Sequence, residues 1–91
     1  MKDVASAEEG IRLDKWLWHA RFFKSRRLAS RMVADGKIRV DGDLVRKAHY
    51  IVRVGDVLTL PKARDIRVVR IEALGTRRGP ATEAQELYTE I

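Results

Sequence analysis

Apolar residues recur at helical spacing in the first third of the chain. From residue 11 to residue 20 they fall at positions i, i+3, i+4 and i+7 of one helix face, as Leu13, Trp16, Leu17 and Ala20. A second stripe at this spacing follows Ser25, a residue type that caps helix N-termini, and consists of Leu28, Ala29, Met32 and Val33. Gly36 supplies a C-terminal stop. The pattern predicts helices over residues 11–20 and from Ser25 to Asp35.

After residue 37 the apolar positions alternate, as they do in half-buried strands. The dipeptide Asp41-Gly42 lies between two such runs and is a strong hairpin signal. Three further strands are predicted, over residues 50–54, 57–60 and 66–74. Pro61 is expected to close the second of them, and a change of parity between Val68 and Val69 predicts a β-bulge in the third.

Helical spacing returns in the last eleven residues, at Ala81, Ala84, Leu87, Tyr88 and Ile91. Thr82 and Gln85 there have the spacing of a capping box. The complete pattern predicts an α+β fold, in which two N-terminal helices pack on a small, mostly antiparallel sheet and a short C-terminal helix follows. Because no repeat or low-complexity tract divides the chain, we expect a polar leader over residues 1–10 and a single domain over residues 11–91.

Composition and charge narrow the choice of function. The chain of 91 residues has no cysteine, which excludes disulfides and thiolate chemistry, and its formal net charge is +6. Residues 11–40 contain nine basic and two acidic residues, whereas residues 81–91 contain three acidic and no basic ones. A segregated basic region favours a polyanionic partner. No apolar stretch is long enough for a membrane span or a signal peptide, so we expect a cytoplasmic protein.

The second predicted helix begins with charges of the unfavourable sign. Lys24, Arg26 and Arg27 surround the cap Ser25, although the helix dipole disfavours cations at this end by about 0.3–1 kcal/mol each. A bound anion would reverse this penalty, because helix N-termini and arginine side chains both bind phosphate. Arg31 and Arg27 lie opposite the apolar stripe and Arg26 lies at its edge. The alternative is a solvated basic face without a ligand.

Few other residues carry chemistry. Trp16 lies on the apolar helix face and is expected in the core, whereas Trp18 lies off it. Trp18 is therefore either half-buried under a loop or a stacking platform for an unstacked base. His19 and His49 have no partner at metal-ligand spacing and are expected at the surface or its boundary. No catalytic motif, metal site or cofactor site is found, and enzyme activity is not expected.

The segment RLDKWLWHARFFKSRRLA, with a glycine at positions 36 and 42 and a lysine at position 47, resembles the RNA-binding domain of small-subunit ribosomal protein S-four, an αL-type RNA-binding motif. Together with VGDVLTL and RRGPATEAQELYTE it resembles the bacterial heat-shock protein fifteen family over residues 11–90. The resemblance implies a non-catalytic, ribosome-associated RNA binder. It also implies recognition of free large ribosomal subunits that still carry a nascent chain on tRNA.

The resemblance implies RNA contacts at Arg12, Arg21, Lys24, Arg26 and Lys47. The helix pattern adds Lys15, Ser25, Arg27 and Arg31, with Trp18 as the candidate stacking residue. Expected partners are ribosomal RNA of the large subunit and tRNA, bound by a monomer away from membranes. The chain departs from the family pattern at Asp41-Gly42, where Asn-Gly is common, and at Lys47-Ala48, where Lys-Pro is common.

Four alternatives stay open on the sequence alone. The first two are a role in small-subunit assembly and a role as an accessory to RNA modification. The third is a protein-interaction module that uses the acidic C-terminal segment, and the fourth is a duplex DNA binder. Salt dependence separates phosphate binding from protein interaction, because phosphate contacts weaken steeply with ionic strength.

Overall fold

The N-terminal third of the chain forms a two-residue strand and two short helices in the computed structural model, which describes residues 9–91. They are β1 (Ile11–Arg12), α2 (Leu13–His19) and α3 (Arg26–Ala34). The helix predicted over residues 11–20 is therefore shorter at its start. The backbone N–H groups of Leu13 and Asp14 donate to the carbonyls of Tyr50 and Ala48, which ties the first turn of α2 to a distant loop. Of the predicted leader, residues 1–8 lie outside the described part.

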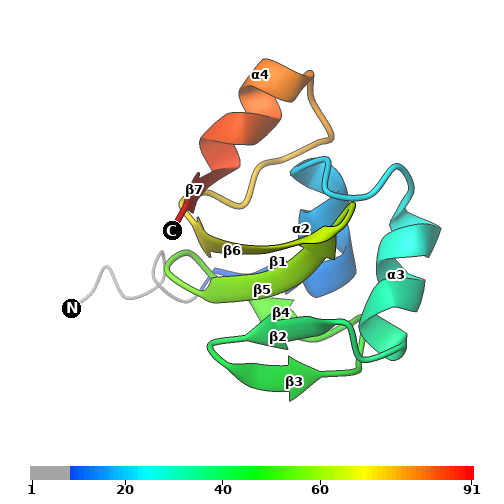
Figure 1. The fold of residues 1–91 in the computed structure, drawn as a ribbon. Helices are drawn as coiled ribbons and strands as arrows, with labels where there is room; N and C mark the ends of the chain where they lie inside the picture. The colour runs from blue at the N-terminus through cyan, green and yellow to red at the C-terminus, as the bar shows by residue number, and fades with distance from the viewer. Residues whose placement is uncertain (1–8) are drawn as a thin grey trace.

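Five antiparallel strands form the main sheet, in the order β3-β2-β5-β6-β7 (Figure 1). They are β2 (Ile38–Val40), β3 (Asp43–Val45), β5 (Val57–Lys62), β6 (Asp65–Ile71) and β7 (Tyr88–Glu90). The predicted hairpin at Asp41-Gly42 is confirmed, because both residues have the positive φ of a type I′ turn, 52° and 88°. The strand predicted over residues 50–54 is shorter. Only β4 (Ile51–Val52) forms, and it pairs with β1.

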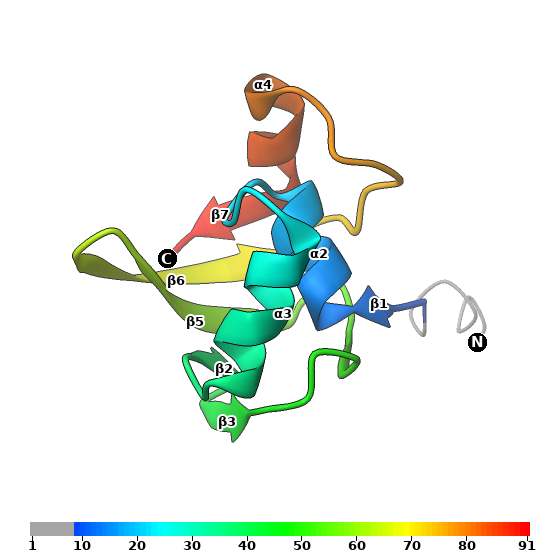
Figure 2. The ribbon, with the colours of Figure 1, turned by 90° about the vertical axis from the view of Figure 1, so that its right-hand side faces the viewer.

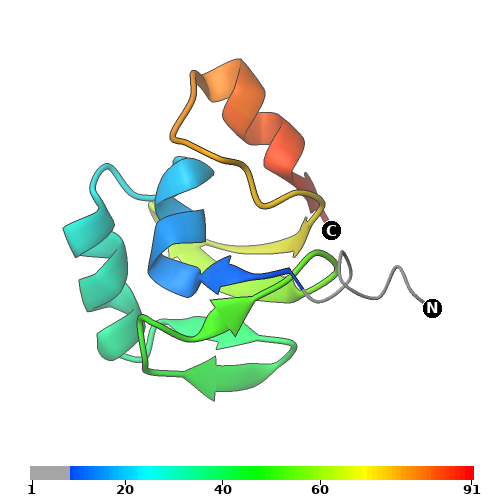
Figure 3. The same cartoon turned by 180° about the vertical axis from the view of Figure 1, so that it is seen from behind.

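The helices and the small β1–β4 ladder lie together against the main sheet. Figure 2 shows α3 and α2 side by side. Figure 3 shows α2 and the two-stranded ladder of β1 and β4 lying across the back of the sheet. The space between these layers is filled by buried apolar side chains, among them Leu17, Val33, Leu58 and Ile71. Trp16 is fully buried there, and its indole N–H donates to the carbonyl of Ala73 at 2.9 Å. Its predicted place in the core is confirmed.

Both predicted ends of α3 are confirmed. The hydroxyl of Ser25 accepts a hydrogen bond from the backbone N–H of Leu28 at 3.0 Å, the geometry of an N-cap. At the other end, Gly36 has a φ of 76° and donates to the carbonyl of Val33, while Lys37 donates to that of Met32. This pair of bonds is a Schellman motif, which satisfies the last carbonyls of the helix.

The predicted β-bulge in β6 is wrong. Pairing with β5 is continuous from Lys62↔Asp65 to Val57↔Arg70. The apparent change of parity arises because the inward position before Val69 is an arginine, Arg67, whose guanidinium lies 5.9 Å from the centre of the Phe22 ring. A charged residue is taken as outward-facing in a hydropathy pattern, even where its side chain points inward and packs on a ring.

Two further expectations about strand and helix ends are corrected. Strand β5 continues through Pro61, because its pairing with β2 is limited to Leu58 and Thr59 and leaves Pro61 unpaired on that side. The C-terminal helix is only one turn of α-helix and one of 3-10 helix, α4 (Ala81–Ala84) and η1 (Gln85–Leu87), before β7. The predicted capping box is absent there, since the N-cap is Pro80 and makes no side-chain bond.

Candidate nucleic-acid interface

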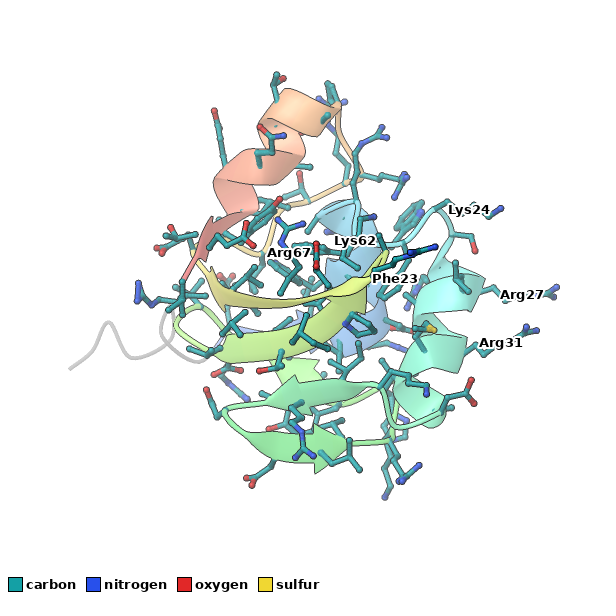
Figure 4. All side chains as sticks on the ribbon, viewed as in Figure 1. Phe23, Lys24, Arg27, Arg31, Lys62 and Arg67 are labelled. Carbon is teal, nitrogen blue, oxygen red and sulfur yellow. The ribbon has the colours of Figure 1, made fainter. Side chains whose placement is uncertain are left out.

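Three exposed cations lie along the outer side of α3 and just before its start. Arg27 and Arg31 have the spacing i and i+4, which places them on one side of the helix, and Lys24 directly precedes the N-cap Ser25. Figure 4 shows Arg27 and Arg31 projecting away from the sheet, with Lys24 on the same side at the start of the helix. Among the described residues none of the three forms an ion pair. This outer row, as we call it, is therefore available to an external anion.

Arg26, at the first position of α3, has a different environment. Its guanidinium lies 3.6 Å from the carboxylate of Asp14, whose side chain is only 3% exposed. Arg12 donates to both oxygens of the same carboxylate, at 3.1 and 3.0 Å. The unfavourable charge predicted at the start of α3 is thus partly balanced inside the protein. Arg27 and Lys24 keep no such partner in the described chain.

Lys47 and Lys15 lie near the same end of the helix pair. The carbonyl of Ala48, the residue after Lys47, accepts the N–H of Asp14, so exposed Lys47 lies beside the first turn of α2. Lys15 is half-buried on that turn. The structure therefore brings Arg12, Lys15, Arg26 and Lys47 to one end of the helix pair, next to the outer row.

Arg21 and Arg78 form a second basic cluster. Of the two, only Arg21 was predicted from the sequence as an RNA contact. Arg21 has a left-handed φ of 64° and donates to the carbonyl of Gly79 at 2.6 Å. Arg78 donates to the carbonyls of Trp18 and Phe23, at 2.7 and 3.0 Å. Burial, followed by the charge of Arg21, lowers the pKa of Arg78. The signal in the sequence was the Arg77-Arg78 pair, but nothing in the pattern placed it beside α2.

Trp18 and His19 lie next to this cluster, and both were expected at or near the surface. The Trp18 ring is half-buried, and the guanidinium of Arg78 lies 5.8 Å from its centre. The expectation for His19 is wrong, because it is 2% exposed and its Nδ1 lies 3.2 Å from the carbonyl of Leu74. The loop after β6 covers this end of α2, which no local pattern indicates. A stacking role for Trp18 stays a prediction.

The acidic C-terminal segment is largely paired within the molecule. Arg67 and Glu90 form a two-bond ion pair that includes Arg67 Nη2 to Glu90 Oε1 at 2.6 Å. This hydrogen bonding lowers the pKa of Glu90 and raises that of Arg67. Arg77 is paired in the same way with Glu83, at 3.2 and 3.0 Å. The two acids are thus engaged, which leaves less negative charge to recruit a basic protein.

The described part of the chain offers no metal site and no membrane-spanning helix. Over residues 9–91 no group of three or more acidic or histidine side chains is placed to hold a metal ion. Within the same residues no helix is long and apolar enough to cross a membrane.

Comparison with known proteins agrees with this geometry. A family model described as the S4 domain matches residues 11–58, which contain both helices and their cations. A solved structure of Vibrio cholerae heat shock protein 15 is 43% identical and superposes with a TM-score of 0.86, covering 91% of this chain and 83% of that one. The chain belongs to the heat shock protein 15 family of S4-domain proteins. The expected α+β fold is confirmed, and the S4 domain is a non-catalytic RNA-binding domain.

Two further relatives show how far the likeness extends. The Escherichia coli K12 protein is 43% identical over 90 residues, which are 99% of this chain and 65% of that protein. Small ribosomal subunit protein uS4 of Kosmotoga olearia is 34% identical over 71 residues. The chain thus spans about two thirds of the length of the E. coli relative. The Vibrio cholerae structure is described as trimeric, whereas we expected a monomer here.

Proposed function

We propose that this protein binds structured ribosomal RNA through the basic surface of α2 and α3. The observation that carries the proposal is the outer row of Lys24, Arg27 and Arg31, which is exposed, has no acidic partner in the described chain and lies within the S4-domain match. Arg27 and Arg31 lie one turn apart on a rigid helix, which suits a phosphate backbone, and arginine can bind phosphate through two hydrogen bonds.

Selectivity in this proposal comes from the shape of the RNA. A folded RNA presents phosphates in a fixed arrangement, and proteins read such RNA mostly by shape and backbone contacts. The outer row would meet one strand of phosphates, while Arg12, Arg26 and Lys47 at the end of the helix pair would meet a neighbouring segment. Arg21 and Arg78 would extend the contact beyond Lys24, because Arg78 donates to the carbonyl of the neighbouring Phe23.

The finer proposal is that the RNA belongs to the free large ribosomal subunit carrying a nascent chain on tRNA. Its support is the likeness to heat shock protein 15 over nearly the whole chain. Such a partner would place the protein in the cytoplasm. Pairing of Glu83 and Glu90 with arginines of the same chain favours this function over a protein-interaction module.

A sedimentation experiment tests the partner. A tagged copy mixed with dissociated ribosomes should migrate with large subunits in a sucrose gradient and be nearly absent from small subunits and intact ribosomes. The double variant Arg27→Gln, Arg31→Gln should stay at the top of the gradient. The matched double variant Lys37→Gln, Arg39→Gln removes the same charge outside the outer row and should still migrate. Equal occupancy of small subunits would contradict the proposal.

We propose one copy of the chain as the binding unit. Sedimentation equilibrium of the free protein should then give a mass near 10.4 kDa. A mass three times as large would assign this chain the assembly described for the Vibrio cholerae relative and would replace the monomer in the proposal.

A further inference from the structure

A hollow lies between α3 and the tip of the β5–β6 hairpin. Its volume is about 350 Å³, at the lower end of the range of about 300–1,000 Å³ for small-ligand pockets. The loop before α3 forms its base, α3 forms one wall and the end of β5 with its turn forms the other. It is lined by Phe22, Phe23, Lys24, Leu28, Met32, Pro61, Lys62 and Ala63.

We propose that this hollow binds one unpaired nucleotide of the RNA, with its base inside and its phosphate at the rim. The inference rests on the proposed function and specifies which feature of the RNA is recognised. The walls offer apolar contact from Leu28, Met32 and Pro61, each half-buried, and the aromatic Phe23, which is 8% exposed. Unpaired bases are commonly bound against aromatic and apolar side chains, because every base has an apolar planar face.

The rim supplies charge for the phosphate of that nucleotide. Lys24 lies on the α3 side and Lys62 on the hairpin side, and no acidic residue lines the hollow. The ammonium of Lys62 donates one hydrogen bond to the carbonyl of Phe22 at 3.0 Å. An ammonium has three donors, so two remain. Arg67, labelled beside Lys62 in Figure 4, is already paired with Glu90 and is not counted as a phosphate ligand.

The position of the hollow connects it with the outer row. Lys24 belongs to both, so a strand of RNA that follows Arg31, Arg27 and Lys24 reaches the rim at its end. A base that leaves the stack at this point would enter between the two walls. The wall formed by residues 61–63 lies beyond the S4-domain match, which ends at residue 58. The hollow is therefore a feature that the basic helices alone do not imply.

An aromatic side chain of a protein would also fit the walls, but it has no negative charge for Lys24 and Lys62. A nucleotide satisfies both the apolar walls and the charged rim. The nucleotide is therefore the occupant that the hollow fits, and an RNA that lacks only the base tests it.

Met32 provides a probe inside the hollow. The chain has two methionines, Met1 and Met32, so methyl-¹³C methionine labelling gives two resonances. The probe ligands are three RNA hairpins with the same stem: one with a single bulged adenosine, one with an abasic nucleotide at the bulge, and one fully paired. The abasic hairpin keeps the phosphate and the flexibility of the bulge and removes only the base.

The adenosine bulge should bind at least about fivefold more tightly than the abasic bulge, the lower limit for stacking one base. It should also move the Met32 methyl resonance upfield, because the ring current of a stacked base shields it. Equal affinity of the two bulges without an upfield shift of Met32 overturns the pocket and leaves RNA binding intact. If none of the three hairpins binds, the proposed function fails together with the pocket.

A pair of variants tests the rim. Lys62→Gln should lower the affinity for the adenosine bulge by about fivefold or more, because a charge-assisted bond to phosphate is lost. Arg64→Gln removes an exposed cation from the same turn, outside the lining of the hollow, and should bind nearly as the parent does. Equal loss in both variants would mean that the hairpin acts only by its general charge and would contradict the proposed rim.

Discussion

Asp14 explains at the scale of one residue why α3 tolerates a cation at its first position. Each cation in the first turn costs about 0.3–1 kcal/mol through the helix dipole, and a half-exposed ion pair returns about 0.2–1 kcal/mol. The two effects nearly cancel for Arg26, whose side chain is 42% exposed. Arg27 has no such compensation within the described chain. A bound phosphate would offset this cost at Arg27, whereas Arg26 is already balanced by Asp14.

Replacing the buried carboxylate tests this balance. Asp14→Asn keeps the size of the side chain and removes the charge that Arg12 and Arg26 share, so we expect a loss of about 1–3 kcal/mol in the free energy of unfolding. Urea denaturation measures it. Asp35→Asn is the matched control, because Asp35 is exposed at the C-terminal end of α3, where a negative charge is unfavourable. It should leave stability unchanged or slightly raised. A loss as large as that of Asp14→Asn would contradict the account.

Residue by residue, prediction from the sequence succeeded where the neighbours along the chain decide the environment. Trp16 lies in the centre of a helical stripe, and its burial follows from that spacing. His19 and Arg67 were misjudged because their environments come from distant segments. The carbonyl that faces His19 belongs to Leu74, and the ring under Arg67 belongs to Phe22. The free cations of the outer row were predicted, but the pairing of Arg26 with Asp14 was not.

At the scale of elements, the start of α3 combines a cap and a candidate phosphate site in Ser25. The two roles make different demands, because a cap needs only an acceptor oxygen for the N–H of Leu28, whereas phosphate binding needs positive charge around it. Aspartate is as good a cap as serine and adds a negative charge. The residue can therefore be changed in a way that separates the roles.

We expect Ser25→Ala to lower the free energy of unfolding by about 1 kcal/mol, since an N-cap bond is lost. Ser25→Asp should be at least as stable as the parent, because aspartate also caps and its charge suits the helix dipole. Its RNA affinity should nevertheless fall well below that of Ser25→Ala. Thermal melts and titrations with one structured RNA measure both quantities. If Ser25→Asp bound RNA as well as the parent, the start of α3 would not contact phosphate.

The β6–β7 pair contains a charge interaction with a defined pH dependence. Hydrogen bonding to Arg67 lowers the pKa of Glu90 below its ordinary value of 4.5. A lowered pKa in the folded state means that the pair stabilises the fold above about pH 4.5 and that this contribution is lost as the pH falls through the lower value. The melting temperature of Glu90→Gln should therefore fall less than that of the parent between pH 7 and pH 3.

The control for this prediction is Glu86→Gln, at an exposed carboxylate of η1. Its melting temperature should fall in acid by as much as that of the parent. If the Glu90→Gln and Glu86→Gln variants behaved alike, the ion pair between Arg67 and Glu90 would make no contribution to acid stability.

The elements themselves were predictable to the extent that local signals define their ends. Helix α3 has a capping serine before it and a glycine after it, and both ends were predicted correctly. Residues 11 and 12 were predicted to be helical, but they form strand β1. Their conformation is fixed by pairing with Ile51 and Val52, which local spacing does not reveal. Tyr88 and Ile91 fit a helical stripe, but pairing of β7 with β6 draws the segment after Leu87 into the sheet.

For the whole molecule, the distribution of charge matters more than its total. Residues 11–40 carry seven more basic than acidic residues, and the outer row leaves three of the basic ones unpaired in the described chain. Two of the three acids at the C-terminal end are held by Arg67 and Arg77. Within residues 9–91 the surface of α2 and α3 therefore has excess positive charge, while two of the three C-terminal acids are held by arginines of the same chain. Such an asymmetry orients a protein toward a polyanion before contact.

The salt dependence of RNA binding measures how many of these cations meet phosphates. With roughly four to six phosphate contacts at about 0.7–0.9 each, the slope of log affinity against log salt should lie near about −3 to −5. Arg27→Gln, Arg31→Gln should make the slope less negative by about 1.4–1.8, because two contacts are removed. Lys37→Gln, Arg39→Gln should leave the slope of the parent unchanged. Fluorescence anisotropy titrations at several salt concentrations give these slopes. A parent slope close to zero would remove the basic surface from the mechanism, and equal slopes in the two double variants would mean that net charge, rather than the outer row, attracts the RNA.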